Sequence, residues 1–340
     1  MVENSEGQYP IYGSGGVIGY ADDYICEKDT VVIGRKGSIN NPIYVSEPFW
    51  NVDTAFGLEA NRKMLLPRYL FYFCKKFDFE KLNKTVTIPS LTKSDLLKIK
   101  IDLPKIEKQQ NIVNKFVKVE SIISFRKQEL QLLDNLIKAR FVEMFGNINI
   151  NDKEWESHPL GELCTIVRGG SPRPIESYLG GNVPWIKIGD ATDGESIYLH
   201  STKEHIIQEG VKKSRLVKAG SLIFANCGVS LGFARIITFD GCIHDGWLAM
   251  EDIDTRLDKV FLLQTLNQMT DHFRKIAPAG TQPNLNTAIM KAYMQIVPPM
   301  ELQQEFISFV HQVDKSKVAV QKALDETQML FDSLMQKYFG

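Results

Sequence analysis

Two segments of the chain carry apolar residues at alternating steps of three and four positions, the pattern of helices that pair along a narrow seam. The predicted seam residues of the first segment are Ile112, Phe116, Val119, Ile123, Leu130, Leu133 and Ile137, and those of the second are Phe306, Val310, Val313, Val320, Leu324 and Phe331. A stripe this narrow favours a two-helix seam over the wider apolar face of a helix on a globular core. A helix that packs only on its own domain remains the alternative.

Both helices have well-marked ends in the sequence. Pro104 and Pro298 precede them and prevent an earlier start, and each ends at a Phe-Gly pair whose glycine, Gly146 or Gly340, can take the left-handed conformation that caps a helix. About 40 residues at roughly 1.5 Å each give a rod of about 60 Å. Because neither helix would be stable alone with its apolar stripe exposed, we expect the two to pair with each other.

The two helical segments are copies of one another. The offset from Pro104 to Pro298 also superimposes Glu107, Gln109, Gln110, Val119, Leu130, Leu136, Phe145 and Gly146 on Glu301, Gln303, Gln304, Val313, Leu324, Leu330, Phe339 and Gly340. The same offset lays the turn TIPSL, residues 87–91, on the turn TQPNL, residues 281–285. A repeat this long describes two copies of a globular domain, each followed by a long helix, and not a solenoid.

The segments between the helices alternate short apolar runs with glycine and proline turns, which predicts strands, and each contains one longer apolar run that predicts a core helix, 66–77 or 259–276. A short strand, 99–104, is expected to lead into the first long helix. The predicted division is a first domain 1–103, a spacer helix 104–146, a linker 147–157, a second domain 158–297 and a C-terminal helix 298–340. The predicted class is α+β, with two tandem α/β domains separated by two long helices that pair as an antiparallel coiled coil.

The first copy is shorter than the second at its front. The second copy has a run from Leu160 through a Gly-Gly turn, predicted to be a strand, before its VPWIK strand, whereas few residues precede Tyr9 in the first copy. We therefore expect the first domain to begin without its first strand and turn.

Composition limits the classes of function. The 340 residues are 44% hydrophobic and 24% charged, with a formal net charge of −1, so no overall basic field indicates a nucleic-acid partner, although a local patch can still supply one. Five cysteines without paired spacing predict reduced thiols and a cytoplasmic protein. No apolar run of about 18 residues or more predicts a membrane span.

Motifs for catalysis are weak throughout. Gly13, Gly15, Gly16 and Gly19 miss the spacing of a nucleotide-binding loop and favour a hairpin turn. The run Asn41–Tyr44 departs from an adenine-methyltransferase motif at its third position. His244 beside Asp245 has no accompanying nucleophile, which favours a structural histidine, and no metal-ligand spacing occurs. The sequence therefore predicts a protein without catalytic residues, metal or cofactor.

Basic, amide and hydroxyl residues instead gather on turns, where such side chains can contact base edges and phosphates. The candidates in the first copy are Tyr12, Ser14, Arg35, Lys36, Ser38, Thr87 and Ser90, and those in the second are Arg168, Ser171, Arg173, Lys187, Asn226, Ser230, Thr281, Gln282 and Asn284. A solvated turn is the alternative for each of them. Two similar domains held apart by a rod favour recognition of a two-part ligand.

The order of domain, proline-led helix with Glu-x-Gln-Gln, second domain and second such helix resembles the specificity subunit of type I restriction-modification enzymes. The runs YPIYGSGGVIGY, VVIGRKGSI, FWNVDTAF and GTQPNL carry the same resemblance, which covers essentially the whole chain. It implies two target recognition domains that read the halves of a split site in double-stranded DNA, about one helical turn apart, and helices that dock two methyltransferase subunits. S-adenosylmethionine would belong to those subunits, and a motor and nuclease subunit would join them.

Two other classes of protein remain alternatives at this point. One is a non-catalytic scaffold whose duplicated domains bind proteins, and it differs from a DNA reader in that its binding need not weaken steeply with salt. The other is a methyltransferase acting alone, which would bind S-adenosylmethionine in the isolated chain.

Overall fold

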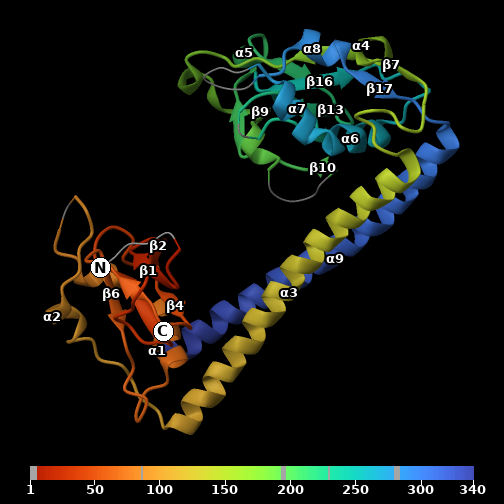
Figure 1. Ribbon diagram of the computed structural model, residues 1–340. Coiled ribbons are helices and arrows are strands. Elements are labelled where there is room, and N and C mark those ends of the chain that lie inside the picture. Colours follow the sequence, from red (N-terminus) through yellow and green to blue (C-terminus); the bar gives the residue numbers. More distant parts are fainter. Residues whose placement is uncertain (1–5, 86, 193–196, 229, 279–283) are drawn as a thin grey trace. The chain divides into compact units, whose positions relative to one another are not determined.

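The computed structural model describes residues 6–85, 87–192, 197–228, 230–278 and 284–340. It divides into two compact units, which Figure 1 displays with their elements labelled. Unit 1 consists of Met1–Gln128 and Lys322–Gly340, and unit 2 consists of Glu129–Gln321. Each unit therefore holds one globular domain together with part of each long helix.

The two long helices, α3 (Ile106–Phe145) and α9 (Met300–Phe339), pair in antiparallel fashion. In unit 1 the beginning of α3 meets the end of α9, where the rings of Phe116 and Phe331 lie 5.4 Å apart in an edge contact. In unit 2 the end of α3 meets the beginning of α9, where Phe141 and Phe306 make a matching contact at 5.4 Å. The predicted fold class is therefore confirmed.

Every residue that the sequence assigns to the helical seam is buried or half-buried in its unit. The helices also bury apolar residues outside that stripe, among them Phe141 and Met335. These additional residues pack on the globular domains, as Phe141 does against Phe261. Each helix therefore contributes side chains both to the helix pair and to the core of a domain. Gly146 takes a left-handed φ of 76° and ends α3 as the sequence predicts.

A buried glutamine ties the start of each long helix to its domain. The Gln109 side chain accepts the amide of Leu66 at 2.9 Å and donates to the carbonyls of Met64 and Pro104 at 2.8 Å. Leu66 is the residue before the core helix of unit 1, so one amide joins the beginnings of two helices.

Gln303 makes the same set of bonds in unit 2. It accepts the amide of Asp258 at 2.9 Å and donates to the carbonyls of Arg256 and Pro298 at 2.9 and 2.7 Å. Both glutamines are fully buried, which explains why the repeat retains an amide within an otherwise apolar helix face.

The described part of unit 1 contains two three-stranded sheets, ordered β2-β1-β5 and β4-β3-β6, and α1 packs on the second of them. The elements are β1 (Tyr9–Gly13), β2 (Gly16–Ala21), β3 (Thr30–Gly34), β4 (Ile43–Val45), β5 (Trp50–Asn51), β6 (Ala55–Leu58), α1 (Pro67–Lys76) and α2 (Lys93–Leu96). All five residues of β3 are buried, as its continuous apolar run predicts. Leu70 and Cys74 of α1 cover this strand and complete the core.

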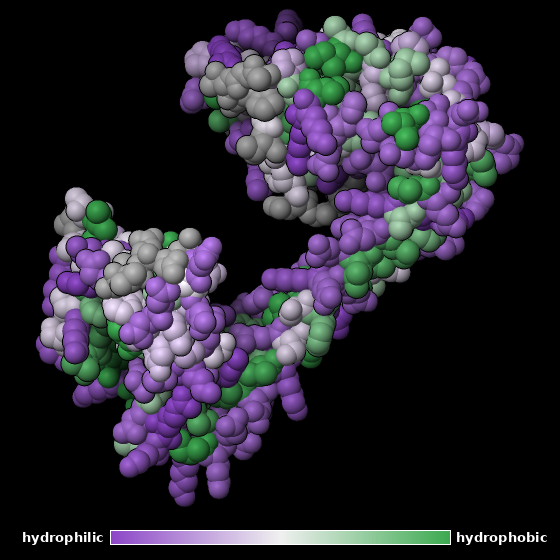
Figure 2. Space-filling model, in the orientation of Figure 1, coloured by the Kyte–Doolittle hydropathy of each residue, from purple (hydrophilic) through white to green (hydrophobic). Residues whose placement is uncertain are grey.

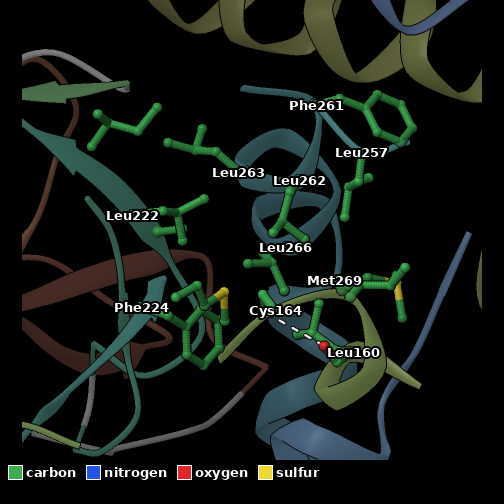
Figure 3. Packing of buried hydrophobic residues seen from close by; sticks show 14 of the residues in the cluster. Leu160, Cys164, Leu222, Phe224, Leu257, Phe261, Leu262, Leu263, Leu266 and Met269 are labelled. Atoms are coloured by element: carbon green, nitrogen blue, oxygen red, sulfur yellow. Dashed lines mark hydrogen bonds between the residues drawn. The ribbon is translucent and has the colours of Figure 1, made fainter. Parts of the chain in front are cut away.

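Unit 2 extends the same plan with more strands. Its described sheets are ordered β10-β14-β13-β16-β8, β11-β9-β15-β12 and β17-β7. The strands are β7 (Ser157–Pro159), β8 (Thr165–Arg168), β9 (Leu179–Ile186), β10 (Tyr198–Leu199), β11 (Glu204–Ile206), β12 (Arg215–Val217), β13 (Leu222–Ala225), β14 (Ala234–Ile237), β15 (Gly241–Ile243), β16 (Trp247–Glu251) and β17 (Met294–Ile296). The helices are α4 (Leu160–Leu163), α5 (Gln208–Val211), α6 (Lys259–Gln268), α7 (Thr270–Ile276) and α8 (Thr287–Ala292). Figure 3 shows α4 and α6 directing apolar side chains into one core with β13.

Two features of the strand pairing repeat between the units. β1 pairs in parallel with β5 in unit 1, as β9 does with β15 in unit 2. The antiparallel pair β3 and β6 corresponds to β13 and β16. The internal duplication therefore extends from the helices to the sheets, as the sequence comparison predicts.

Three predicted elements are wrong. Residues 99–104 form no strand, and the segment 160–163 is a helix where a strand was expected. The predicted helix 259–276 divides into α6 and α7 at Met269. Beside this break the Asn267 side chain accepts the amide of Ala234, the first residue of β14, and the Thr270 hydroxyl donates to the carbonyl of Gly232 just before that strand. These tertiary contacts accompany the end of the first helix.

Candidate nucleic-acid interface

In unit 1, the loop after β3 pairs with the Thr-x-Pro turn, so two candidate segments far apart in the sequence meet. Gly37 donates its amide to the carbonyl of Pro89 at 3.0 Å, and Leu91 donates to the carbonyl of Arg35 at 2.9 Å. Lys36 and Ser90 form an isolated antiparallel bridge between these bonds. The side chains of Lys36, Ser38 and Thr87 are exposed on the paired loops. We name the seven candidate residues of this unit, from Tyr12 to Ser90, the unit 1 loop cluster.

Arg35 connects these loops to the end of β6. Its amide donates to the carbonyl of Thr54 at 2.7 Å, and its guanidinium donates to the carbonyl of Asp53 at 3.3 Å. The guanidinium also lies 5.8 Å from the ring centroid of Phe56. These contacts hold the side chain at the domain surface without an ion pair to a carboxylate among the described residues, which leaves its charge available to a ligand.

The hairpin β1–β2 brings Tyr12 and Ser14 to the same loops. The Tyr12 ring meets Phe49 edge to face at 5.3 Å, and its carbonyl accepts the amide of Val52. Burial, with a smaller effect of Glu47, raises the pKa of the Tyr12 hydroxyl, which therefore stays a hydrogen-bond donor at neutral pH. A methyl group on Gly34 would lie 3.1 Å from Cβ of Ser14, so the serine stands directly over the end of β3.

In unit 2, the corresponding loops pair in the same way. Leu285 donates its amide to the carbonyl of Asn226 at 2.8 Å, and Cys227 bridges Asn284. The side-chain amide of Asn226 lies within 3.2 Å of the side-chain oxygen of Asn284 and of the Leu285 carbonyl. Asn226 is fully buried, and its predicted contact with DNA stays a prediction. It positions the second turn, and the half-buried Asn284 remains a candidate contact.

Asp245 organises the remaining candidates of unit 2. Its backbone carbonyl accepts the guanidinium of Arg168 at 3.1 Å, and its carboxylate accepts the Ser171 hydroxyl at 2.8 Å. The guanidinium of Arg173 lies 3.8 Å from the other carboxylate oxygen, with its side chain 83% exposed. One acidic residue thus holds three predicted contacts on one loop, and Arg173 is the least constrained of them. We name these residues, together with Lys187, His244 and Asn284, the unit 2 loop cluster.

His244 and Trp185 form the floor of this cluster. His244 lies 2.9 Å from the Asp245 carboxylate through Nε2, and its Nδ1 accepts the amide of Gly246 at 2.9 Å. Burial, opposed by Asp245 and assisted by Lys187, lowers the pKa of His244, so the ring is neutral at pH 7. In that state Nε2 carries the proton and donates to Asp245.

A cavity of about 320 Å³ opens beside this floor. Its lining consists of Ser171, Pro172, Arg173, Pro174, Ile175, Glu176, Trp185 and His244. The Trp185 ring is buried, and its indole N–H has no partner within the described part of the chain. An unsatisfied buried donor next to a cationic side chain suits a ligand that presents hydrogen-bond acceptors.

The other candidates of unit 2 lie around the same loops. The Lys187 ammonium pairs with Glu204 and lies 5.9 Å from the Trp185 ring centroid. Ser230 is half-buried on the loop between β13 and β14. Thr281 and Gln282 lie outside the described residues, so their predicted roles stay predictions.

Sequence reasoning did not include Asp245, His244 or Trp185 among the DNA contacts. The pair His244–Asp245 is visible as a dipeptide, but only the fold reveals that its carboxylate faces Ser171 and Arg173 from another segment. The arrangement can hold charged and polar donors in place.

Other kinds of site find little support in the described residues. Within them, no group of three or more acidic, histidine or cysteine side chains is placed to hold a metal ion. All five cysteines are free thiols. Among the described helices, none is both long and apolar enough to cross a membrane.

Comparison with known proteins gives the loop clusters a context. The family model described as the type I restriction modification DNA specificity domain matches residues 2–135 and 152–327. The specificity subunit of the type I restriction enzyme MjaIX from Methanocaldococcus jannaschii is 24% identical over 332 residues, which cover 90% of this chain and 74% of that protein. The MjaVIII specificity subunit from the same organism is 20% identical over 333 residues and covers 88% and 77%.

Solved structures agree in fold. The type I restriction-modification S subunit from M. genitalium superimposes with a TM-score of 0.57 at 17% identity and covers 99% of this chain and 90% of that chain. A chain from a study of the assembly and conformational transition of a type I system gives a TM-score of 0.61 at 19% identity, with 92% and 82% covered. Both domains and both helices take part in these matches, and the chain belongs to the type I restriction-modification DNA specificity family.

Proposed function

We propose that this chain is the DNA-reading subunit of a type I restriction-modification complex, in which each loop cluster reads one half of a two-part site. The observation that carries the proposal is the repeated pairing of two distant loops in both units, which collects donors of the kind that base edges and phosphates accept. The family membership supports the same role for both domains.

The charges of the clusters suit this task better than the net charge of the chain suggests. In unit 1, Arg35 and Lys36 stand on loops whose backbone is fixed by hydrogen bonds, so the backbone of these loops loses little freedom on binding. In unit 2, Arg173 is held only loosely by Asp245, and it can leave that carboxylate for guanine or a phosphate. Arg168 and Ser171 would keep the loop in position meanwhile.

The exposed faces of the long helices supply a docking surface for partner subunits. Large apolar side chains stay exposed there, and Figure 2 shows apolar surface along the helix pair. Leu136 in unit 2 is 47% exposed, and Leu330, its counterpart in the repeat, is 51% exposed in unit 1. Identical exposed leucines at equivalent positions support two equivalent docking sites, one for each of two methyltransferase subunits.

The chemistry belongs to the partners under this proposal. The methyltransferase subunits would bind S-adenosylmethionine and modify adenine, and a motor and nuclease subunit would join to cut unmodified DNA. The loop clusters select the site, and the helices set the separation between its halves.

The docking sites are tested by changing one leucine at a time. Leu136→Glu and Leu330→Glu keep a good helix former and place a charge on the apolar surface. Each variant should bind one methyltransferase subunit in place of two in native mass spectrometry of the purified complex. Retention of two subunits by both single variants and by the double variant would contradict the assignment.

The reading function is tested by sequencing the methylome of cells that express the chain with its methyltransferase subunit. We expect modified adenines in a split motif, which gives both half-sites at once. Binding of the purified complex to that motif should weaken steeply as salt rises. Binding partners that are proteins alone, with weak salt dependence, would favour a scaffold.

A further inference from the structure

The hairpin β1–β2 of unit 1 carries an exposed apolar side chain next to the unit 1 loop cluster. Ile18 of β2 is 61% exposed, although the neighbouring strand β1 buries Ile11 and Gly13. A single exposed apolar residue is ordinary on a protein surface and indicates nothing by itself. The backbone around Ile18, however, is arranged to hold this side chain in a particular place.

Ile18 is the extra residue of a β-bulge. The register sets Ile11 opposite Gly19 and Tyr12 opposite Val17, so Ile18 falls between these pairs with no opposite residue in β1. A bulge of this kind bends its strand and changes the direction of a side chain, and bulges are frequent next to functional sites. The bulge therefore directs Ile18 independently of the alternation of side chains along the rest of β2.

The side chain of Ile18 lies against the turn that leads to the loop cluster. A Cβ on Gly13 would lie 3.5 Å from Cγ2 of Ile18 and 3.5 Å from the hydroxyl oxygen of Thr54, so both side chains flank this glycine. The carbonyl of Thr54 accepts the amide of Arg35 at 2.7 Å, and the carbonyl of Asp53 accepts the Arg35 guanidinium at 3.3 Å. An apolar group is thus held beside a predicted DNA contact.

The corresponding position of unit 2 holds a charged residue. The first residue of β1 that pairs with β5 opposes Gly19 of β2. In unit 2 the first residue of β9 that pairs with β15, Trp185, opposes Glu204 of β11. Lys203, the residue before Glu204, therefore corresponds to Ile18, and it is exposed as well. One exposed position is apolar in one unit and cationic in the other, as two readers of different half-sites require.

The chemistry of DNA indicates what an apolar side chain at this position contacts. In the major groove the base edges present hydrogen-bond donors and acceptors, and thymine alone among the four bases adds a C5-methyl group. Arg35 and Ser14 supply hydrogen-bond donors in the loop cluster, and Ile18 adds an apolar surface beside them. A donor set with one apolar member suits a half-site that contains a T·A pair.

We propose that Ile18 is a specificity-determining residue of unit 1 that contacts the C5-methyl group of a thymine in the half-site read by this unit. The inference rests on the proposed function and deepens it, because it names the base and the group that this side chain reads. Contact removes both apolar surfaces from water, and burial of one methyl-sized group corresponds to about fourfold in affinity.

The test uses the complex of the full chain with its methyltransferase subunits and duplexes that carry the motif found in the methylome. Each thymine of the motif is replaced in turn by deoxyuridine, which lacks only the C5-methyl group. The native complex should bind one of these duplexes about fourfold more weakly than the thymine duplex. Ile18→Ala should bind the two duplexes within about 1.5-fold of each other, because the contact is already absent from this variant.

Ile25→Ala is the matched control, because Ile25 is 56% exposed in the same unit. It precedes Cys26, and a Cβ on Gly57 would lie 2.8 Å from the Cys26 sulfur and 3.4 Å from Cγ2 of Thr30. Thr30 begins β3, whereas the loop cluster stands at the end of that strand, so Ile25 lies away from the predicted contacts. This variant should retain the full preference of the native complex for thymine over uracil. If Ile18→Ala does not assemble, Ile18→Ser removes the same apolar surface and replaces it.

The results that would overturn the assignment differ from those that would contradict the proposed function. A motif without thymine, no effect of uracil at any position, an equal uracil effect in Ile18→Ala, or loss of the effect in Ile25→Ala would each overturn the role of Ile18. Sequence-selective binding by the native complex would leave DNA reading intact in all four cases. Equal binding of the native complex to the motif and to unrelated duplexes would contradict the proposed function itself.

Discussion

The two units are built on one plan, yet they differ in what their matched residues do. The loop after the central strand accepts the same backbone bond in both, from Leu91 to Arg35 in unit 1 and from Leu285 to Asn226 in unit 2. The side chains at that position differ, because Arg35 reaches the surface and Asn226 is buried. The backbone framework is therefore constant while the side chains on it vary, as two readers of different half-sites require.

Burial shows the same contrast at the helix ends. Phe145 and Phe339 occupy equivalent positions, but Phe145 is fully buried and Phe339 is half-buried. Phe145 meets the rings of Phe261 and Phe306 at 4.9 and 5.5 Å, within the larger core of unit 2. An identical residue therefore contributes more to the stability of its unit where more of the domain packs around it.

The largest effect is expected from truncating these phenylalanines. Phe145→Ala removes a buried ring and leaves a cavity, and it should lower the free energy of unfolding of unit 2 by about 3–5 kcal/mol. Phe339→Ala should cost clearly less in unit 1, because part of that ring is already in water. Urea unfolding followed by tryptophan fluorescence and circular dichroism measures both. Equal costs would show that the two units do not differ in packing at this position.

A smaller and equal effect is expected at the two buried glutamines. Gln109→Leu and Gln303→Leu keep the approximate volume but leave an amide N–H and two carbonyls without partners in each unit. Each substitution should cost about 1–3 kcal/mol of unfolding free energy. Gln110→Leu, at an exposed position one residue later, serves as the control and should change stability by less than about 0.5 kcal/mol. Costs that differ widely between the units would break the equivalence of these anchors.

Much of this framework was predictable from local pattern. The seam residues, the helix ends and the equivalence of the Thr-x-Pro turns follow from periodicity and from identities at one offset, because a duplicated sequence inherits its backbone contacts. The glutamines of Glu-x-Gln-Gln also stood out, although their partners did not. The residues that the two copies share are thus the ones whose structural roles can be predicted from the sequence.

The remainder depends on contacts between distant segments. Asp245 gains its importance from Ser171 and Arg173, which no spacing relates to it. The missing strand at 99–104 has a related cause, since a β strand forms only with a partner and the described residues of unit 1 provide none. Asn226 is a predicted DNA contact because it is an amide residue on a turn, and the sequence does not reveal that its side chain is buried and bonds Asn284 and Leu285.

One substitution in each loop cluster tests which half-site that cluster reads. Arg35→Ala should alter recognition of one half-site and Arg173→Ala that of the other, with a loss of about 1–3 kcal/mol confined to one or two base pairs. Binding of the assembled complex to DNA libraries that vary one half-site at a time gives both profiles. Lys36→Ala is the contrasting variant, because loss of a phosphate contact should weaken all sequences alike. Uniform weakening by Arg173→Ala would refute its assignment as a reader.

The smallest effect is expected from the titration of His244, a residue for which the described part of unit 1 shows no equivalent pair with a carboxylate. The folded protein holds the pKa of His244 below its ordinary value of 6.5, chiefly through burial. The unfolded chain therefore binds a proton more readily than the folded chain. The stability that the neutral ring provides is present above about pH 6.5 and is lost as the pH falls toward the folded pKa.

Protonation would also remove the acceptor that Nδ1 offers to the amide of Gly246, which loosens the loop bearing Asp245. NMR titration of the histidine ring should give an apparent pKa below 6.5. His244→Asn retains an acceptor near the Gly246 amide without titrating, so its melting temperature should fall less than that of the native chain between pH 7.5 and pH 5.5. A His244 pKa at or above 6.5, or identical pH profiles for the two proteins, would show that burial does not control this ring and that the loop of unit 2 is held by Asp245 alone.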